Sequence, residues 1–221
     1  MDGSHAITPA DRLDALAHAA EGLSGEELLD LAITRHFRER IAAVSSFGAE
    51  AALLLDMIAR IDPATPVIFL ETGKHFPETL RYRDRLIAKL GLTGVRDERP
   101  DEADRQTSDP DGHLWSRSPD ACCGLRKVRP LERALAGFDA WITGRKRFQA
   151  SSREALPRLE LADGRVKVNP LADWTQAEVD AAFKARGLPR HPLVDHGYPS
   201  IGCLPCTRRI GEGEDPRAGR W

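Results

Sequence analysis

The sequence contains no apolar run approaching the roughly 18 residues that a membrane-spanning helix requires. Its opening residues, MDGSHAITPADRLD, lack the basic-then-apolar order of a secretory signal. The formal net charge is only -2 over 221 residues, which excludes an overall basic nucleic-acid binder. These absences predict a cytoplasmic globular protein with no membrane or nucleic-acid partner. They leave the oligomeric state open, a homo-oligomer included.

Cysteine is also scarce, with four residues in the whole chain. In a reducing cytoplasm such thiols are expected to be free, catalytic or metal-binding rather than disulfide-bonded. They form two pairs, Cys122 with Cys123 and, much later, Cys203-Leu-Pro-Cys206. A disulfide between adjacent cysteines would close a strained ring, so thiolate ligation of a metal centre is the better explanation.

The adjacency of Cys122 and Cys123 bears on which metal is bound. Neighbouring cysteines are awkward for one tetrahedral ion, but each can reach a different iron of a cubane. The pattern therefore favours a 4Fe-4S cluster, and zinc remains the alternative. Basic residues flank both pairs and would offset the negative charge of a thiolate-ligated cluster: Arg126, Lys127, Arg208 and Arg209.

Apolar periodicity predicts alternating strands and helices. Helices are expected over 11–22, 24–38, 51–61, 77–90 and a dozen residues ending at Gly187; strands are expected over 41–45, 66–70, near Val95 and over 139–143. This alternation predicts an α/β fold, a parallel sheet with helices on both faces. We expect residues 1–221 to form one domain, with N-terminal helices in 1–40, an α/β core in 41–187 and a loop-like segment in 188–221.

In a parallel sheet, ligands bind beyond the carboxyl ends of the strands. The loop SSFGAE follows the first predicted strand and offers the hydroxyls of Ser45 and Ser46, close backbone approach at Gly48 and a helix N-terminus, all suited to an anion. It is not a Walker loop, because no Gly-Lys-Ser/Thr follows. An ordinary turn capped by Ser46 is the alternative.

Two further loops lie at the same predicted edge. ETGKHF offers Thr72 and Gly73 for ligand contact, or is a solvated turn. The loop 144–153 carries four cations, and guanidinium forks suit phosphate or sulfate oxygens. A solvated run of charge is the alternative there. The cations are Arg145, Lys146, Arg147 and Arg153.

Seven segments together resemble the assimilatory adenylyl-sulfate (APS) reductases, within the wider phosphoadenylyl-sulfate (PAPS) reductase family. They are SSFGAE, PATPVIFLETGKHFPETLRYRD, CCGLRKVRPL, WITGRKRFQASSR, KVNPLADWT, HPLVDHGYPSIGCLPCTR and GEDPRAGRW, in the family's order. The resemblance implies a fold like the adenine nucleotide α-hydrolases. Two positions depart from the family pattern: Glu71 replaces an aspartate, and Ala51 stands where relatives often have serine.

The resemblance also implies roles for individual residues. It makes SSFGAE a phosphate-binding loop and places the LETG residues near the adenosine. It implies a 4Fe-4S cluster on the four cysteines. The implied substrate-binding residues are Ser45, Ser46, Gly48, Leu70, Thr72, Gly73, Lys127, Gly144, Arg145, Arg147, Arg153, Arg217 and Arg220, and the implied cluster ligands are Cys122, Cys123, Cys203 and Cys206.

The implied reaction is the reduction of APS to sulfite and AMP in sulfate assimilation. A cysteine thiolate attacks the sulfur, and thioredoxin or a glutaredoxin-like dithiol protein then frees sulfite. The family carries this nucleophile in a Glu-Cys-Gly-x-His motif, which we expect beyond Trp221. The alternatives are a PAPS reductase, an ATP-dependent nucleotide α-hydrolase relative and a non-catalytic metal-binding sensor.

Overall fold

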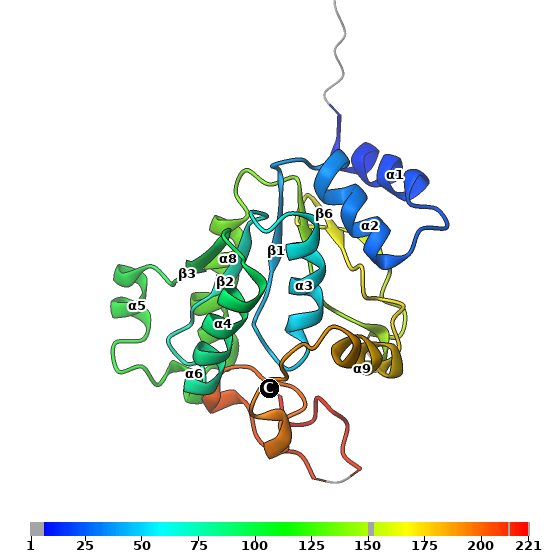
Figure 1. The fold of residues 1–221 in the computed structure, drawn as a ribbon. Helices are drawn as coiled ribbons and strands as arrows, with labels where there is room; N and C mark the ends of the chain where they lie inside the picture. Colours follow the sequence, from blue (N-terminus) through cyan, green and yellow to red (C-terminus); the bar gives the residue numbers. More distant parts are fainter. Residues whose placement is uncertain (1–6, 150–152, 212, 221) are drawn as a thin grey trace, which may run out of the picture.

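The structure is a computed structural model and describes residues 7–149, 153–211 and 213–220 (Figure 1). Its centre is a six-stranded sheet in the order β3-β2-β1-β4-β6-β5. Every neighbouring pair is parallel except β5 with β6, so the predicted parallel sheet is confirmed apart from one edge. The strands are β1 (Ile41–Val44), β2 (Val67–Leu70), β3 (Val95–Glu98), β4 (Ala140–Ile142), β5 (Leu159–Ala162) and β6 (Arg165–Val168).

The antiparallel edge is a hairpin that the sequence analysis did not predict. Ala162 pairs with Arg165, so only Asp163 and Gly164 form the connection. Both have positive φ, 54° and 71°. Such a two-residue turn matches the right-handed twist of the strands, and Asp-Gly is among its preferred sequences.

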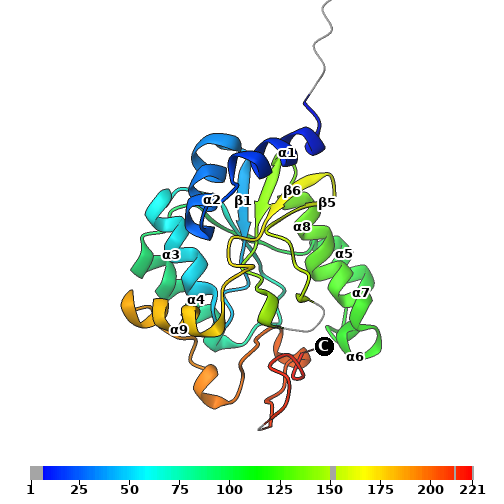
Figure 2. The same cartoon turned by 90° about the vertical axis from the view of Figure 1, so that its right-hand side faces the viewer.

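Helices cover both faces of the sheet, as predicted (Figures 1 and 2). Side chains of β1 alternate between two cores: Ile41 and Ala43 pack toward α3 and α4, and Ala42 packs with Leu135 on the other face, beside α8. The helices that contribute buried residues to the larger core are α1 (Pro9–Ala19), α2 (Gly25–Leu31), α3 (Ala51–Ile61), α4 (Pro77–Leu90) and α9 (Gln176–Ala185).

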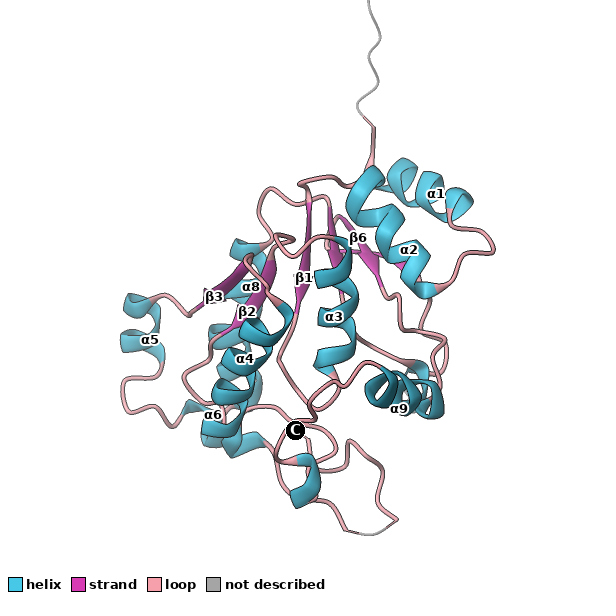
Figure 3. Cartoon of the chain, in the orientation of Figure 1, coloured by secondary structure: helices cyan, strands magenta, loops and turns pink. Residues whose placement is uncertain are grey.

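Between β3 and β4 the chain forms short helices that had no prediction (Figure 3). They are α5 (Glu102–Ser108), α6 (Leu114–Arg117), α7 (Pro119–Cys123) and α8 (Arg129–Ala134). A wider π-type turn, Gly124–Val128, joins α7 directly to α8. The adjacent cysteines therefore lie on a helix. Among the described helices, none is both long enough and apolar enough to cross a bilayer.

The segment 188–220 runs beneath the carboxyl ends of the strands (Figure 2). It is anchored on α4, where the fully buried His191 bonds to Thr79 (Nε2 to Oγ1, 3.0 Å) and the hydroxyl of Tyr82 donates to the Pro189 carbonyl at 2.8 Å. The helical turns in its described residues are the short Val194–His196 and Leu204–Cys206. A segment poor in regular structure is thus held over the end of the sheet where ligands bind.

Candidate functional site

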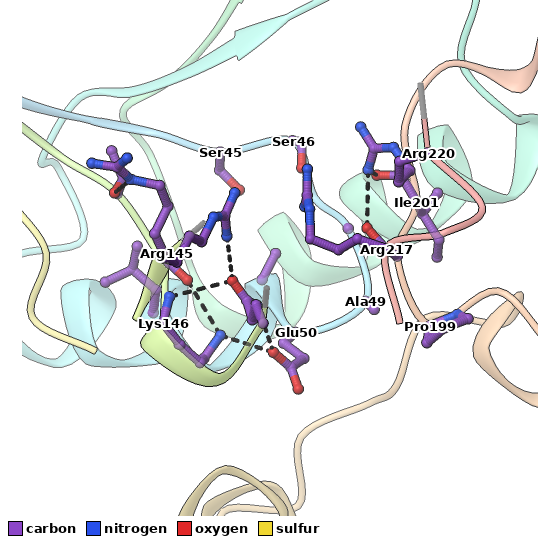
Figure 4. A pocket seen from close by; sticks show the side chains of 18 of the residues that line it. Ser45, Ser46, Ala49, Glu50, Arg145, Lys146, Pro199, Ile201, Arg217 and Arg220 are labelled. Carbon is purple, nitrogen blue, oxygen red and sulfur yellow. Dashed lines mark hydrogen bonds and ion pairs between the residues drawn. The ribbon is translucent and has the colours of Figure 1, made fainter. Parts of the chain in front are cut away.

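A cavity of about 300 Å³ opens at the carboxyl ends of β1 and β4 (Figure 4). The strand order reverses here, because the chain leaves β1 toward β2 on one side and returns as β4 on the other. Such switch points are where open α/β sheets bind ligands. Eight of the substrate-binding residues predicted above line this cavity: Ser45, Ser46, Gly48, Gly144, Arg145, Arg153, Arg217 and Arg220.

The loop 45–50, which is predicted to bind phosphate, is a fixed turn. Phe47 has φ +48° and packs its buried ring edge-on against Phe69, at 5.5 Å between centroids. Its backbone N–H donates to Ser45 Oγ at 3.1 Å. A Cβ on Gly48 would lie 3.3 Å from Ser46 Oγ, so glycine keeps this turn tight.

The loop leads directly into α3, whose first turn faces the cavity. Within the described chain, the N-cap residue Glu50 makes no side-chain hydrogen bond to that turn. The first backbone N–H groups of a helix have no intrahelical partners and carry partial positive charge. The start of α3 can therefore supply donors to an anion in the cavity.

Three arginines give the cavity its net positive charge. Among the described residues, no carboxylate pairs with Arg153, Arg217 or Arg220. Burial, reinforced by neighbouring guanidiniums, lowers the pKa of Arg153 to about 10. Arg220 is held by the Ile201 carbonyl, to which Nη1 donates at 2.5 Å. Like charges kept this close favour a bound anion.

Two other cations at the cavity are already neutralised. Lys146 Nζ lies 2.9 Å from a Glu50 carboxylate oxygen, and Arg145 forms an ion pair with Glu160. Burial lowers the pKa of Lys146, and the Glu50 carboxylate opposes that shift. Neither Glu50 nor Glu160 was predicted from the sequence as part of the site.

The remaining predicted substrate contacts lie outside the cavity lining. Arg147 braces the basic loop, residues 144–153, by donating from Nε to the Leu156 carbonyl at 2.8 Å and pairing with Asp173. In the LETG turn, Glu71 accepts from the Gly73 N–H at 2.8 Å, so the longer acid still holds the turn. The residues outside the lining are Leu70, Thr72, Gly73, Lys127 and Arg147.

The LETG turn instead adjoins the cysteines. Thr72 Oγ1 lies 3.4 Å from Cys203 Sγ, and the Leu204 N–H donates to the Lys74 carbonyl at 2.7 Å. His75 pairs its backbone with Cys203 and contacts the Leu70 carbonyl through Nε2 at 2.9 Å. The second cysteine pair is thereby fixed against the end of β2.

All four cysteines are free thiols, and they affect one another electrostatically. Burial raises the pKa of the Cys122 thiol, and Cys123 and Cys203 raise it further. Burial also raises the pKa of Cys206, with contributions from Cys203 and Cys123. The fold therefore brings the two pairs into one neighbourhood. In the part of the chain described, however, no three His, Cys, Asp or Glu side chains are arranged to hold a metal ion.

Arg126 lies beside this cysteine group. It is almost fully buried, donates from Nη1 to the Thr72 carbonyl at 2.6 Å and pairs through Nη2 with Asp109 at 2.5 Å. Its Nε is buried and has no hydrogen-bond partner among the described residues. An unpaired buried donor is costly, so this position favours an acceptor close by.

The predicted compensation of thiolate charge is only partly observed. Arg126 opposes the rise in the pKa of Cys122, and Lys127 and Arg220 oppose the rise in the pKa of Cys206. Arg208 instead pairs with Glu214 at 2.9 Å, and Arg209 stacks over the Tyr198 ring, 5.6 Å from its centroid. Arg220 thus contributes to both the cavity and the cysteine group.

Residues 40–209 match the model of the phosphoadenosine phosphosulfate reductase domain, and the chain belongs to that family. An adenosine 5'-phosphosulfate reductase of Mesorhizobium japonicum is 50% identical over 215 residues, covering 96% of this chain and 85% of that protein. A phosphoadenosine 5'-phosphosulfate reductase of Gloeobacter violaceus is 42% identical, covering 95% and 88%.

A comparison with solved structures agrees with this family assignment. The PAPS reductase of Candida auris, a phosphate complex, matches with TM-score 0.76 and 31% identity, over 93% of this chain and 100% of that one. An FMN adenylyltransferase of Candida glabrata matches with TM-score 0.58 at 12% identity, over 96% and 80% of the two chains. The second likeness concerns the fold alone. The expected adenine nucleotide α-hydrolase-like fold is confirmed.

Proposed function

We propose that this chain binds adenosine 5'-phosphosulfate in the cavity and serves its reduction to sulfite and AMP in sulfate assimilation. The observation that carries the proposal is a group of arginines with no carboxylate partner among the described residues, Arg153, Arg217 and Arg220, around a phosphate loop at the switch point. A phosphosulfate presents two adjacent anionic groups to such guanidinium forks. The Mesorhizobium relative, half identical in sequence, is named for this activity.

Phosphoadenosine 5'-phosphosulfate is the second candidate substrate. It is favoured by the names of two relatives, those of Gloeobacter violaceus and Candida auris, which are less similar than the Mesorhizobium protein. Comparing the dissociation constants of the two nucleotides by calorimetry decides between them. Tighter binding of the 3'-phosphorylated compound would reverse our preference.

We further propose that Cys122, Cys123, Cys203 and Cys206 hold a 4Fe-4S cluster, which places this chain in the iron-sulfur branch of its family. The orphaned Nε of Arg126 supports this assignment, because a thiolate or sulfide nearby would satisfy it. Four free thiols gathered in one neighbourhood would be able to hold such a cluster. When bound, the cluster would supply fixed charge beside the substrate without redox cycling.

In the proposed reaction a cysteine thiolate attacks the sulfur of APS. A sulfur–sulfur bond forms as the bond from that sulfur to the bridging oxygen breaks, and AMP leaves with the electron pair. A dithiol protein such as thioredoxin or glutaredoxin then displaces sulfite and is itself oxidised to the disulfide. The arginines of the cavity stabilise the charge on the departing phosphate.

The nucleophile is a further cysteine, because the proposal commits all four cysteines of the 221 residues to the cluster. We expect it in a Glu-Cys-Gly-x-His motif beyond Trp221. Residues 1–221 would then form one reductase domain that binds APS but produces almost no sulfite with thioredoxin. The same chain extended through that motif should be active.

Two measurements test the proposal. Anaerobic purification with iron and acid-labile sulfide counted per chain should give about four of each; one zinc and no sulfide would refute the cluster. Calorimetric titration with APS should show saturable binding that weakens with added salt. An absence of binding by the cluster-loaded protein would refute the function.

A further inference from the structure

A closed hydrogen-bond network holds the guanidinium of Arg145 at the cavity wall. Its Nη2 donates to Glu160 on β5, and its Nε lies 3.4 Å from Thr143 Oγ1. Asn169, fully buried directly after β6, donates from Nδ2 to Glu160 Oε1 at 3.1 Å and to the Pro157 carbonyl at 2.9 Å. Asn169 Oδ1 accepts from the Thr143 hydroxyl at 2.5 Å.

The network connects the hairpin to the site. Thr143 and Arg145 follow β4, whereas Glu160 and Asn169 belong to the β5–β6 unit at the edge of the sheet. Glu160 has a second cationic neighbour, Lys167 Nζ at 3.5 Å, which is itself held over the Trp141 ring, 4.4 Å from its centroid. The carboxylate is therefore fixed from several sides.

We propose that Glu160 is a positioning residue for the substrate: it pre-orients Arg145 toward the anion in the cavity. This inference rests on the proposed function. A free arginine has many rotamers to lose when it binds, and a side chain already held in one orientation loses fewer. The hairpin thus serves the site without contributing a residue to its lining.

Glu160 also has an opposing effect, since its charge cancels that of Arg145 and weakens long-range attraction for an anion. The cavity keeps the charge of Arg153, Arg217 and Arg220, so the cancelled charge of Arg145 is a smaller part of its attraction for an anion. Orientation therefore outweighs neutralisation, and removing the carboxylate weakens binding.

The test is calorimetric titration of the 221-residue protein with APS. E160A should weaken binding about five- to tenfold, the cost of ordering one long side chain. E160Q keeps an acceptor oxygen for Arg145 and should restore most of the affinity. In an R145A background, E160A should cause no further loss. E78A, which removes the carboxylate that pairs with Arg81 on α4, is the control and should bind as the wild type does.

Thermal melts of every variant separate loss of affinity from loss of folding. An unchanged affinity in folded E160A would overturn the inference, and so would an equal further loss in the R145A background. The same loss in E78A would also overturn it, because the effect would not then be specific to Glu160. Failure of the wild type to bind APS refutes the proposed function itself, and this inference with it.

Discussion

The ammonium of Lys146 lies 2.9 Å from the carboxylate of Glu50 and is almost completely buried beside the cavity. Glu50 also accepts hydrogen bonds from Gln149 Nε2 at 3.0 Å and Gln176 Nε2 at 3.1 Å. One carboxylate at the start of α3 therefore fastens the basic loop and the start of α9. Removing the Glu50 carboxylate should therefore reduce the stability of the fold rather than act directly on the reaction.

E50A should lower the free energy of unfolding by about 3 kcal/mol, because it leaves the Lys146 charge buried without a partner. Urea denaturation measures the change. The double variant E50L/K146M should lose less than E50A, since no charge is then left buried. A double variant less stable than E50A would show that the pair itself, rather than its stranded cation, sets the cost.

R217A should weaken APS binding by about 10- to 100-fold, because it removes a charged donor that has no carboxylate partner in the described structure. It should also make the affinity less dependent on salt. The matched control is R81A on α4, whose guanidinium pairs with Glu78 at 3.2 Å. Equal losses in R217A and R81A would contradict a local role for Arg217.

G202A should expel a guanidinium from the cavity without unfolding the protein. A Cβ on Gly202 would lie 2.3 Å from Arg220 Nη2, closer than atoms can approach, so Arg220 must move. We expect G202A to lose as much APS affinity as R220A, and the double variant to lose no more. G124A is the control, since a Cβ there meets nothing within 4 Å. Wild-type affinity in G202A would refute the prediction.

Acid should destabilise the anchor of the segment 188–220. The Leu193 N–H donates to His191 Nδ1 at 3.2 Å, so the neutral ring donates from Nε2 to Thr79. Burial lowers the pKa of His191 to about 4, from the ordinary 6.5. Between those values the unfolded chain binds a proton that the folded protein does not. Stability should therefore fall from pH 6.5 to 4, by up to about 3 kcal/mol.

The measurement is urea denaturation at several pH values, for the wild type and for H191N. Asparagine does not titrate and can still accept from Leu193. H191N should be less stable than the wild type at neutral pH. The difference between their free energies of unfolding should narrow as the pH falls toward 4. A constant gap would show that His191 titrates normally.

The predicted helices 51–61 and 77–90 match α3 and α4 because local signals fix their ends. Pro77 occupies the first turn of α4, and Gly91 ends it with φ +68°. The helix predicted over 24–38 was too long, since regular α-helix ends at Leu31 and a π-type turn follows. The hairpin was not predicted, although Asp163-Gly164 is a local signal for its two-residue turn.

The lining of the cavity was largely predictable, because its serines, glycines and arginines lie in recognisable loops. Its acids were not. Glu50 meets Lys146 across 96 residues of sequence, and no local pattern indicates such a pair. Glu160 became part of the site only through the hairpin. The placement of Arg147 against Asp173 likewise depends on tertiary structure.

Arg220 interacts with both the cavity and the group of four cysteines. Burial lowers the pKa of Arg220, neighbouring Arg217 lowers it further, and the thiols of Cys203, Cys206 and Cys123 oppose that shift. A charge that interacts with both sites couples their occupancies, and such coupling is reciprocal by thermodynamic necessity. A ligand in the cavity should therefore change the affinity of the four cysteines for the proposed cluster, and the cluster should change the affinity for that ligand by the same factor.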